Sequence, residues 1–93
     1  MHHHVGPMIR KLRKWLHYVE LVKKKPPPTQ DFVSLQRTKR RDLLSGLAPS
    51  FARYGTTIDL RALPTAPFTR DSFTSGAVQR LNILVLSFIV KIS

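Results

Sequence analysis

The strongest constraint on the fold is a helical repeat of apolar residues near the start of the chain, closed by three consecutive prolines. At about 100° per residue, most of the apolar side chains of residues 8–25 fall in one arc of roughly 140°, while Leu21 and most of the basic side chains fall outside it. Residues 26–28 end this helix, because proline has no amide hydrogen to donate and restricts the residue before it. The sequence therefore predicts an amphipathic helix whose apolar arc consists of Met8, Ile9, Leu12, Trp15, Leu16, Val19 and Val22.

A second helix is predicted from about residue 31 to residue 46. Asp31 is a suitable N-cap, and Gly46 together with Pro49 is expected to end the helix. The middle of this segment, residues 36–42, has no apolar side chain. It is therefore expected either to face a charged partner or to fray in solution.

The second half of the chain is apolar and rich in turn residues. Alternating apolar and polar residues favour a short strand over 56–63, and Pro64 would end it. The apolar run at residues 77–93 fits a helix or a strand, and a helix docked on a neighbouring protein is favoured. As a membrane span this run is short of the about 20 residues that a bilayer requires.

These elements predict a mainly α fold in a small, extended chain that depends on a partner for its order. With 93 residues and no cysteine, the chain is at most one small domain without disulfides. Its predicted parts are a leader or tag remnant at residues 1–7, a basic helical segment at 8–48, an irregular linker at 49–76 and an apolar anchor at 77–93.

Positive charge dominates the composition. Sixteen Lys and Arg residues stand against five Asp and Glu, for a net charge of +11. Residues 1–41 hold eleven basic and two acidic residues, a net charge of +9, so the first half carries most of the field. Such a field draws a chain toward RNA, DNA or an anionic membrane surface.

The basic clusters at both sides of the prolines are interpreted as two halves of one phosphate-binding surface, with the prolines as a stiff spacer. Aromatic side chains at Trp15, Tyr18, Phe51 and Tyr54 could stack on unpaired bases, although Trp15 fits a core position better. The predicted nucleic-acid contacts are Arg10, Lys11, Arg13, Lys14, Lys23, Lys24, Lys25, Arg37, Lys39, Arg40, Arg41, Arg53 and Tyr54. The predicted protein anchor is Ile83, Leu84, Val85, Leu86, Phe88 and Ile89.

These features favour a structural RNA-binding component of a large ribonucleoprotein, contacting rRNA and neighbouring proteins, with the mitochondrial ribosome as the specific hypothesis. An acid-poor basic helix near the N-terminus resembles a mitochondrial import sequence. The alternative is a non-catalytic accessory subunit of a mitochondrial inner-membrane respiratory complex, with its basic helix on anionic lipid. Nuclear localisation is a second alternative, because the two basic clusters are spaced like a bipartite import signal.

The residues give no support for catalysis. His17 is the only histidine outside residues 1–7, the five carboxylates are scattered, and no glycine-rich phosphate loop is present. Neither a cofactor, a metal nor a small-molecule substrate is expected, since three adjacent histidines at 2–4 cannot close a tetrahedral site alone. The run Pro64-Thr65-Ala66-Pro67 resembles a PTAP late-budding peptide, with a simple turn as the competing interpretation.

Overall fold

Helices form all the regular structure in the part of the chain that the computed structural model describes, residues 5–24 and 29–92. The three α-helices are α1 (Val5–Lys23), α2 (Gln30–Arg53) and α3 (Gly76–Ile92), and the two short 3-10 helices are η1 (Leu60–Ala62) and η2 (Arg70–Phe73). The predicted mainly α fold and the predicted C-terminal helix are confirmed. The first helix begins earlier than predicted, since residues 5–7 of the expected leader belong to α1.

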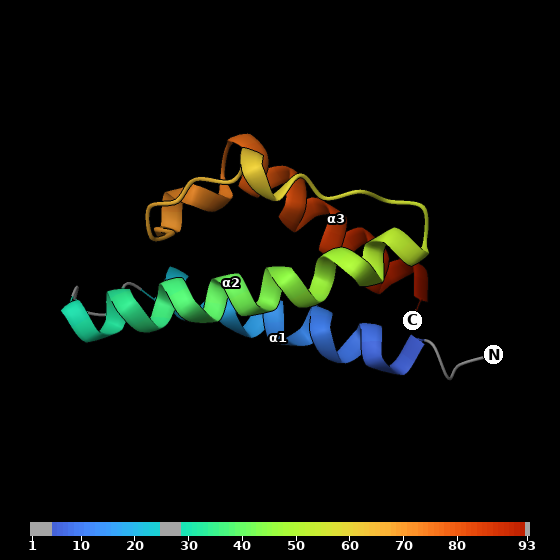
Figure 1. Cartoon of the computed structure of the whole chain (residues 1–93), viewed down its shortest axis with the longest axis horizontal. Coiled ribbons are helices and arrows are strands. Elements are labelled where there is room, and N and C mark those ends of the chain that lie inside the picture. The colour runs from blue at the N-terminus through green and yellow to red at the C-terminus, as the bar shows by residue number, and fades with distance from the viewer. Residues whose placement is uncertain (1–4, 25–28, 93) are drawn as a thin grey trace.

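The chain is arranged as an antiparallel helix pair with a third helix across it. In Figure 1, α1 and α2 lie side by side and run in opposite directions, and the segment between α2 and α3 returns along α2 toward its first turns. The start of α1 and the end of α3 therefore lie at the same end of the molecule. This return path carries Phe68 and, in η2, Phe73 into the core.

The apolar arc of α1 is the centre of the core. Trp15 is fully buried, and its ring contacts the rings of Tyr18 and Phe68 at centroid distances of 5.5 and 6.4 Å. Its indole N–H donates to Oδ1 of Asn82 on α3 over 3.3 Å, which gives the polar atom of the tryptophan a partner.

The radius of gyration is 13.4 Å, against about 13 Å for a globular chain of 100 residues. The expectation of an extended chain is therefore wrong.

The second helix begins and ends at residues other than those predicted. Thr29, not Asp31, is the N-cap, and its side-chain oxygen accepts a hydrogen bond from the amide of Phe32 over 3.1 Å. At the other end, Gly55 adopts a positive φ of 77° just after the C-cap. The amides of Gly55 and Thr56 donate to the carbonyls of Ala52 and Phe51, which is the hydrogen-bond pattern of a Schellman motif.

Pro49 lies inside α2, where the sequence predicted the helix to have ended. A proline within a helix costs about 3 kcal/mol, because it removes one hydrogen bond and crowds the preceding turn. Leu47 and Phe51 flank it and are both fully buried, and Phe51 packs edge-on against Phe88 of α3 at 4.7 Å. We attribute the continuation of the helix to this burial, which offsets the cost of the proline.

The predicted strand over 56–63 is wrong. Residues 60–62 form η1 instead, and Oδ1 of Asp59 caps it by accepting from the amide of Arg61 over 3.0 Å. Of the alternating apolar residues Ile58, Leu60 and Ala62, Ile58 packs partly against the core, whereas Leu60 and Ala62 are exposed. In the described ranges, this segment has no neighbouring strand to supply a ladder of backbone hydrogen bonds.

Candidate nucleic-acid interface

An open groove between α1 and α2 brings together basic residues from the two clusters. Its volume is about 450 Å³. Lys11 and Lys14 enter it from α1 and Lys39 enters it from α2, with Asp42 as the one acidic residue in the lining. We call this feature the α1–α2 groove, and it is completed by Leu35, Thr38, Leu43 and Gly46.

The positions of these lysines follow from the amphipathic pattern of α1. The apolar arc faces the core, so the basic side chains between its members are turned outward. Lys14 and Lys39 are exposed, whereas Lys11 is half-buried and its ammonium group donates to Oγ of Ser50 over 3.0 Å. Lys11 therefore joins α1 to α2 as well as contributing its charge to the groove.

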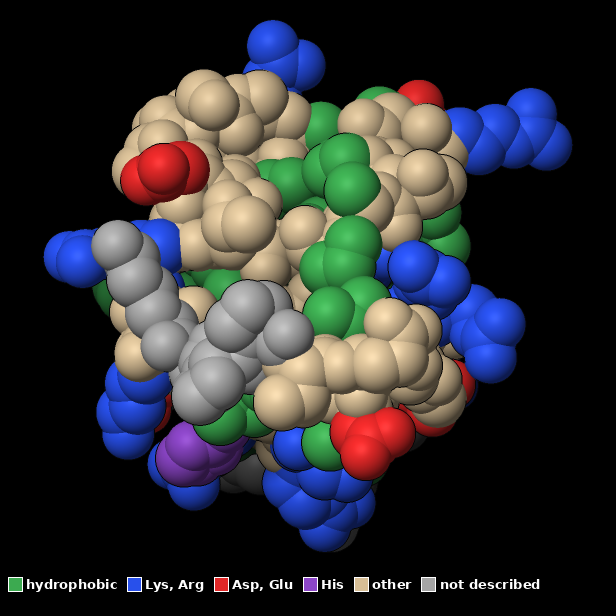
Figure 2. All heavy atoms as spheres, turned by 90° about the vertical axis from the view of Figure 1, so that its left-hand side faces the viewer, with side chains coloured by type: hydrophobic (Ala, Val, Ile, Leu, Met, Phe, Trp, Pro, Cys, Tyr) green, Lys and Arg blue, Asp and Glu red, His purple; other side chains and the backbone are tan. Residues whose placement is uncertain are grey.

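The other predicted cationic contacts are spread over the surface of the helix pair. The side chains of Arg10, Arg13, Lys24 and Arg53 are exposed. Lys23 is also exposed, with Nζ 5.7 Å from the centre of the Phe73 ring, while Lys25 lies outside the described residues. Figure 2 shows the end of the molecule at which α2 begins, where Lys and Arg side chains project around the outline and hydrophobic side chains form a strip near the centre.

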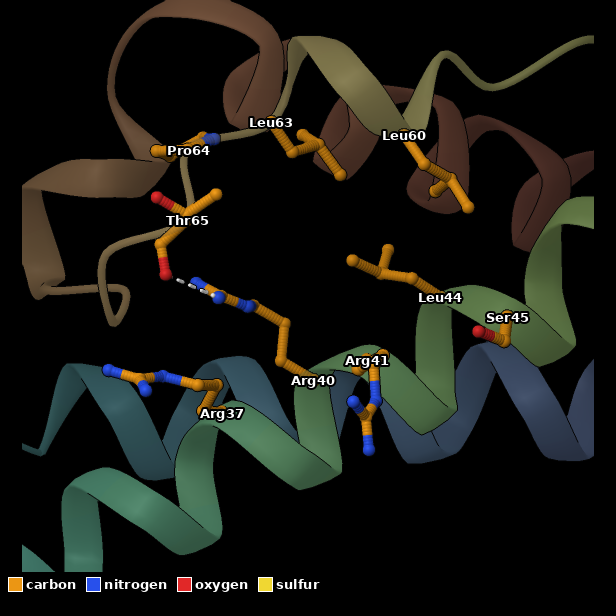
Figure 3. A pocket seen from close by; sticks show the side chains of 9 residues that line it. All are labelled: Arg37, Arg40, Arg41, Leu44, Ser45, Leu60, Leu63, Pro64 and Thr65. Carbon is orange, nitrogen blue, oxygen red and sulfur yellow. Dashed lines mark hydrogen bonds between the residues drawn. The ribbon is translucent and has the colours of Figure 1, made fainter.

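Arg40 has a different place from the one predicted. Its side chain is buried, and its guanidinium group donates to the backbone carbonyls of Thr65 and Ala66 over 2.9 and 2.5 Å. The same group lies 4.5 Å from the centre of the Phe68 ring. Figure 3 shows Arg40 extending from α2 toward Thr65, with Arg37 and Arg41 on either side of it along the helix. The prediction that Arg40 contacts phosphate is therefore corrected to an internal role, while Arg37 and Arg41 remain exposed.

The middle of α2, which was expected either to face a charged partner or to fray, makes internal contacts of the same kind. Gln36 is buried beside Arg40, and its Nε2 donates to the carbonyl of Phe68 over 3.0 Å. These two polar side chains thus hold the segment 65–68 against the part of α2, residues 36–42, that has no apolar side chain. The pattern missed them because a buried glutamine or arginine has the same sequence signature as an exposed one.

Three of the four aromatic side chains proposed to stack on bases are unavailable. Trp15, Tyr18 and Phe51 have at most 1% of their surface exposed, so a base could reach them only by disrupting the core. Tyr54 is 41% exposed and rests edge-on against Phe88 at 5.8 Å. A single accessible ring supports contacts to phosphate rather than a run of stacked bases.

Tyr18 is buried, and its hydroxyl group lies within the core. Its Oη has no hydrogen-bond partner in the part of the chain that the structure describes. Burial raises the pKa of Tyr18 to about 12, while the positive charge of Arg40 acts in the opposite direction. The phenol is therefore neutral at physiological pH and serves as a core side chain.

The predicted protein anchor divides between the core and the surface. Val85 and Phe88 are buried inside the protein, and Leu84 and Ile89 pack partly against that core. Ile83 and Leu86 are 58% and 46% exposed. Val90 is 78% exposed and lies one turn beyond Leu86 on α3, so the outer face of this helix includes a residue that the sequence analysis did not select.

Two further findings concern metals and membranes. Among residues 5–24 and 29–92, no group of three or more His, Asp or Glu side chains is placed to hold a metal ion, and residues 2–4 lie outside those ranges. No helix in the same ranges is long and apolar enough to cross a bilayer.

In the PTAP-like run, Pro64, Thr65 and Ala66 are exposed, but the carbonyls of Thr65 and Ala66 accept hydrogen bonds from Arg40.

Comparisons of the chain with protein families, with curated proteins and with solved structures found no match.

Proposed function

We propose that this protein binds RNA through the phosphate backbone, as a structural and non-catalytic component of a large ribonucleoprotein. The observation that carries the proposal is the α1–α2 groove, where Lys14 and Lys39 are exposed on neighbouring helices together with Lys11. These residues come from clusters on opposite sides of the prolines. Lysines on one rigid helix pair provide a fixed pattern of positive charge, which suits a backbone of regularly spaced phosphates.

The expected mode of binding is recognition of charge and shape. Arg37, Arg41, Arg10 and Arg13 extend the positive surface beyond the groove. Tyr54 is the exposed aromatic ring among the predicted contacts, which favours phosphates over base edges or stacking. Affinity carried by phosphates falls steeply with salt, with a logarithmic slope of about −0.7 per neutralised phosphate on single strands and about −0.9 on duplexes.

The proposed host is the mitochondrial ribosome. The support is the basic, acid-poor first helix, which resembles an import sequence and whose apolar side packs in the core. Ile83, Leu86 and Val90 on the outer face of α3 provide an apolar surface for a neighbouring protein of the assembly.

The burial of α1 favours RNA over the membrane alternative. An amphipathic helix lies on lipid by inserting its apolar face into the bilayer. Leu12 and Trp15, at the centre of that face, are both fully buried against α2, α3 and the connecting segment. Insertion of α1 would therefore require the core to open, whereas its basic side chains contact RNA with the fold intact.

The test is the salt dependence of RNA binding by two variants of equal net charge. Lys14→Gln/Lys39→Gln removes two charges from the α1–α2 groove, and Arg61→Gln/Arg80→Gln removes two exposed charges that do not line it. Binding of a structured RNA is measured by fluorescence anisotropy over a series of KCl concentrations. We expect the groove variant to bind more weakly and its logarithmic slope to flatten by about 1 to 2, the change that one or two lost phosphate contacts produce.

Equal slopes for the two variants would contradict the proposal, because they would show that binding depends on net charge rather than on the groove.

The host is tested separately by sedimentation of the endogenous protein from detergent-solubilised mitochondria. Release from a large particle by ribonuclease is the expected result. Retention in a large complex after ribonuclease treatment would favour a membrane assembly instead.

A further inference from the structure

We infer that a second groove, between α2 and the segment before η2, binds a single aliphatic chain that carries an anionic head group such as a carboxylate. This groove has a volume of about 310 Å³ and is distinct from the α1–α2 groove. We call it the α2–loop groove. It is lined by Arg37, Arg40, Arg41, Leu44, Ser45, Leu60, Leu63, Pro64 and Thr65.

The walls of the α2–loop groove are aliphatic. Leu44 projects from α2, and Leu60 and Leu63 face it from the other side, as Figure 3 shows. Leu44 is 7% exposed and forms the inner wall, whereas Leu60 is 40% exposed at the opening. Burial of an apolar chain against these side chains would remove hydrocarbon surface from water on both partners.

The two walls are held at a set separation by hydrogen bonds. Arg40 binds the carbonyls of Thr65 and Ala66, and Gln36 binds the carbonyl of Phe68, so the segment that carries the outer wall is tied to α2. Because hydrogen bonds within the protein set this arrangement, binding does not require the segment to be ordered first. A preformed groove of this kind lowers the entropic cost of association.

The polar part of the lining is cationic. Arg37 and Arg41 are exposed and lie one helical turn apart on α2, flanking Arg40. None of the nine lining residues is acidic. A guanidinium group presents a fork of N–H donors that matches a carboxylate, so the head of the ligand is expected to meet Arg37 or Arg41 at the groove opening.

The lining also selects against a nucleobase. None of the nine described lining residues is aromatic, so an unpaired base would lack a ring among them on which to stack. Pockets for small ligands span about 300 to 1,000 Å³, which places this groove at the lower limit and suits one narrow chain. An aliphatic carboxylate satisfies both the apolar walls and the cationic opening, and this inference does not rest on RNA binding.

The experiment uses three probes that separate the head from the chain. Methyl and amide NMR spectra of the full chain are recorded with decanoate below its micelle concentration, with decyltrimethylammonium, and with butyrate. Decanoate is expected to shift the methyl signals of Leu44, Leu60 and Leu63 in a saturable manner. Equal shifts with the cationic probe would overturn the inference, because they would show that the arginines do not select the head group. Equal shifts with butyrate would also overturn it, because they would show that the aliphatic chain is not bound and that the site binds anions at the surface.

Two variants and a matched control test the assignment to this groove. Leu60→Gln changes one wall, Arg37→Gln/Arg41→Gln changes the opening, and Leu86→Gln changes a leucine of similar exposure on α3. Each groove variant is expected to weaken decanoate binding by about tenfold, the scale of one charge-assisted hydrogen bond or one buried apolar contact. Equal affinities for the groove variants and Leu86→Gln would overturn the inference.

A last pair of spectra separates a free ligand from a bilayer lipid, because both present an aliphatic chain with an anionic head. Spectra with phosphatidylglycerol vesicles are compared with those for free decanoate. Shifts at the groove leucines with free decanoate support a soluble ligand. Shifts with vesicles alone would overturn the inference in favour of membrane surface binding.

Discussion

The guanidinium group of Arg40 lies 4.5 Å from the centre of the Phe68 ring and donates to the carbonyls of Thr65 and Ala66. One buried side chain thus joins the middle of α2 to the segment that leads into η2. It donates to two backbone carbonyls from a part of α2, residues 36–42, that has no apolar side chain. Its exposed neighbours on α2 line the two candidate binding features, Lys39 in the α1–α2 groove and Arg37 and Arg41 in the α2–loop groove.

Arg40→Ala should lower the free energy of unfolding by about 2 to 4 kcal/mol, because it removes two charge-assisted hydrogen bonds and the ring contact. Arg37→Ala, on the same helix but exposed, should change it by no more than about 0.5 kcal/mol. Urea denaturation followed by circular dichroism measures both. Equal losses for the two variants would show that the internal contacts of Arg40 contribute nothing to stability.

Two glycines of α2 and its C-terminus should respond to alanine with opposite signs. Gly46 is inside the helix, and an added Cβ would lie 4.0 Å from the nearest atoms of Lys11, so Gly46→Ala should stabilise the protein by about 1 kcal/mol. Gly55 has a φ of 77°, a conformation that strains a side chain, so Gly55→Ala should destabilise it by about 1 kcal/mol. Thermal unfolding of the pair is the measurement, and shifts of the same sign would contradict this account of where α2 ends.

The raised pKa of Tyr18 predicts a loss of stability at high pH. Burial raises this pKa from 10.0 to about 12, so between these values the unfolded chain loses the phenolic proton while the folded protein keeps it. The unfolded state then binds fewer protons, and the free energy of unfolding falls as the pH rises through this window, by a total of about 2 to 3 kcal/mol.

Urea denaturation at neutral pH and at points across the window measures this loss, with two phenylalanine variants as controls. Tyr18→Phe should remove this share of the pH dependence, whereas Tyr54→Phe, which changes an exposed ring, should retain it. At neutral pH, Tyr18→Phe should be as stable as the native protein or more stable by about 1 kcal/mol, because the buried hydroxyl has no partner among the described residues. An identical alkaline loss in the native protein and Tyr18→Phe would refute the prediction.

Local patterns predicted the type of element more reliably than its ends. The periodicity of residues 8–25 predicted both the first helix and its buried side, since Leu12, Trp15 and Val22 are in the core. Both ends of α2 were predicted wrongly. Asp31 and Gly46 are residue types that commonly cap helices, but Thr29 is the N-cap and Gly55 follows the C-cap in the folded protein. Residue types that can cap a helix occur at several positions in the chain, and tertiary packing decides which of them ends the helix.

The candidate interface shows the same division. Lys14 and Lys39 were predicted as cationic contacts from composition, and both line the α1–α2 groove. Their proximity depends on the antiparallel packing of two helices, which no local pattern specifies. The α2–loop groove was not predicted, since Leu44 and Leu63 are nineteen positions apart and meet only because the chain returns along α2.

A basic chain of helices with one apolar arc at its centre can be deduced from local sequence alone, because charge and helical periodicity are properties of neighbouring residues. Which of three similar arginines is internal depends on the packing of the chain. Arg37, Arg40 and Arg41 lie within about one turn of α2, and only the position of Thr65, Ala66 and Phe68 places Arg40 inside. The physical reason is that burial depends on what packs against a helix face, and here that segment lies some 25 residues further along the chain.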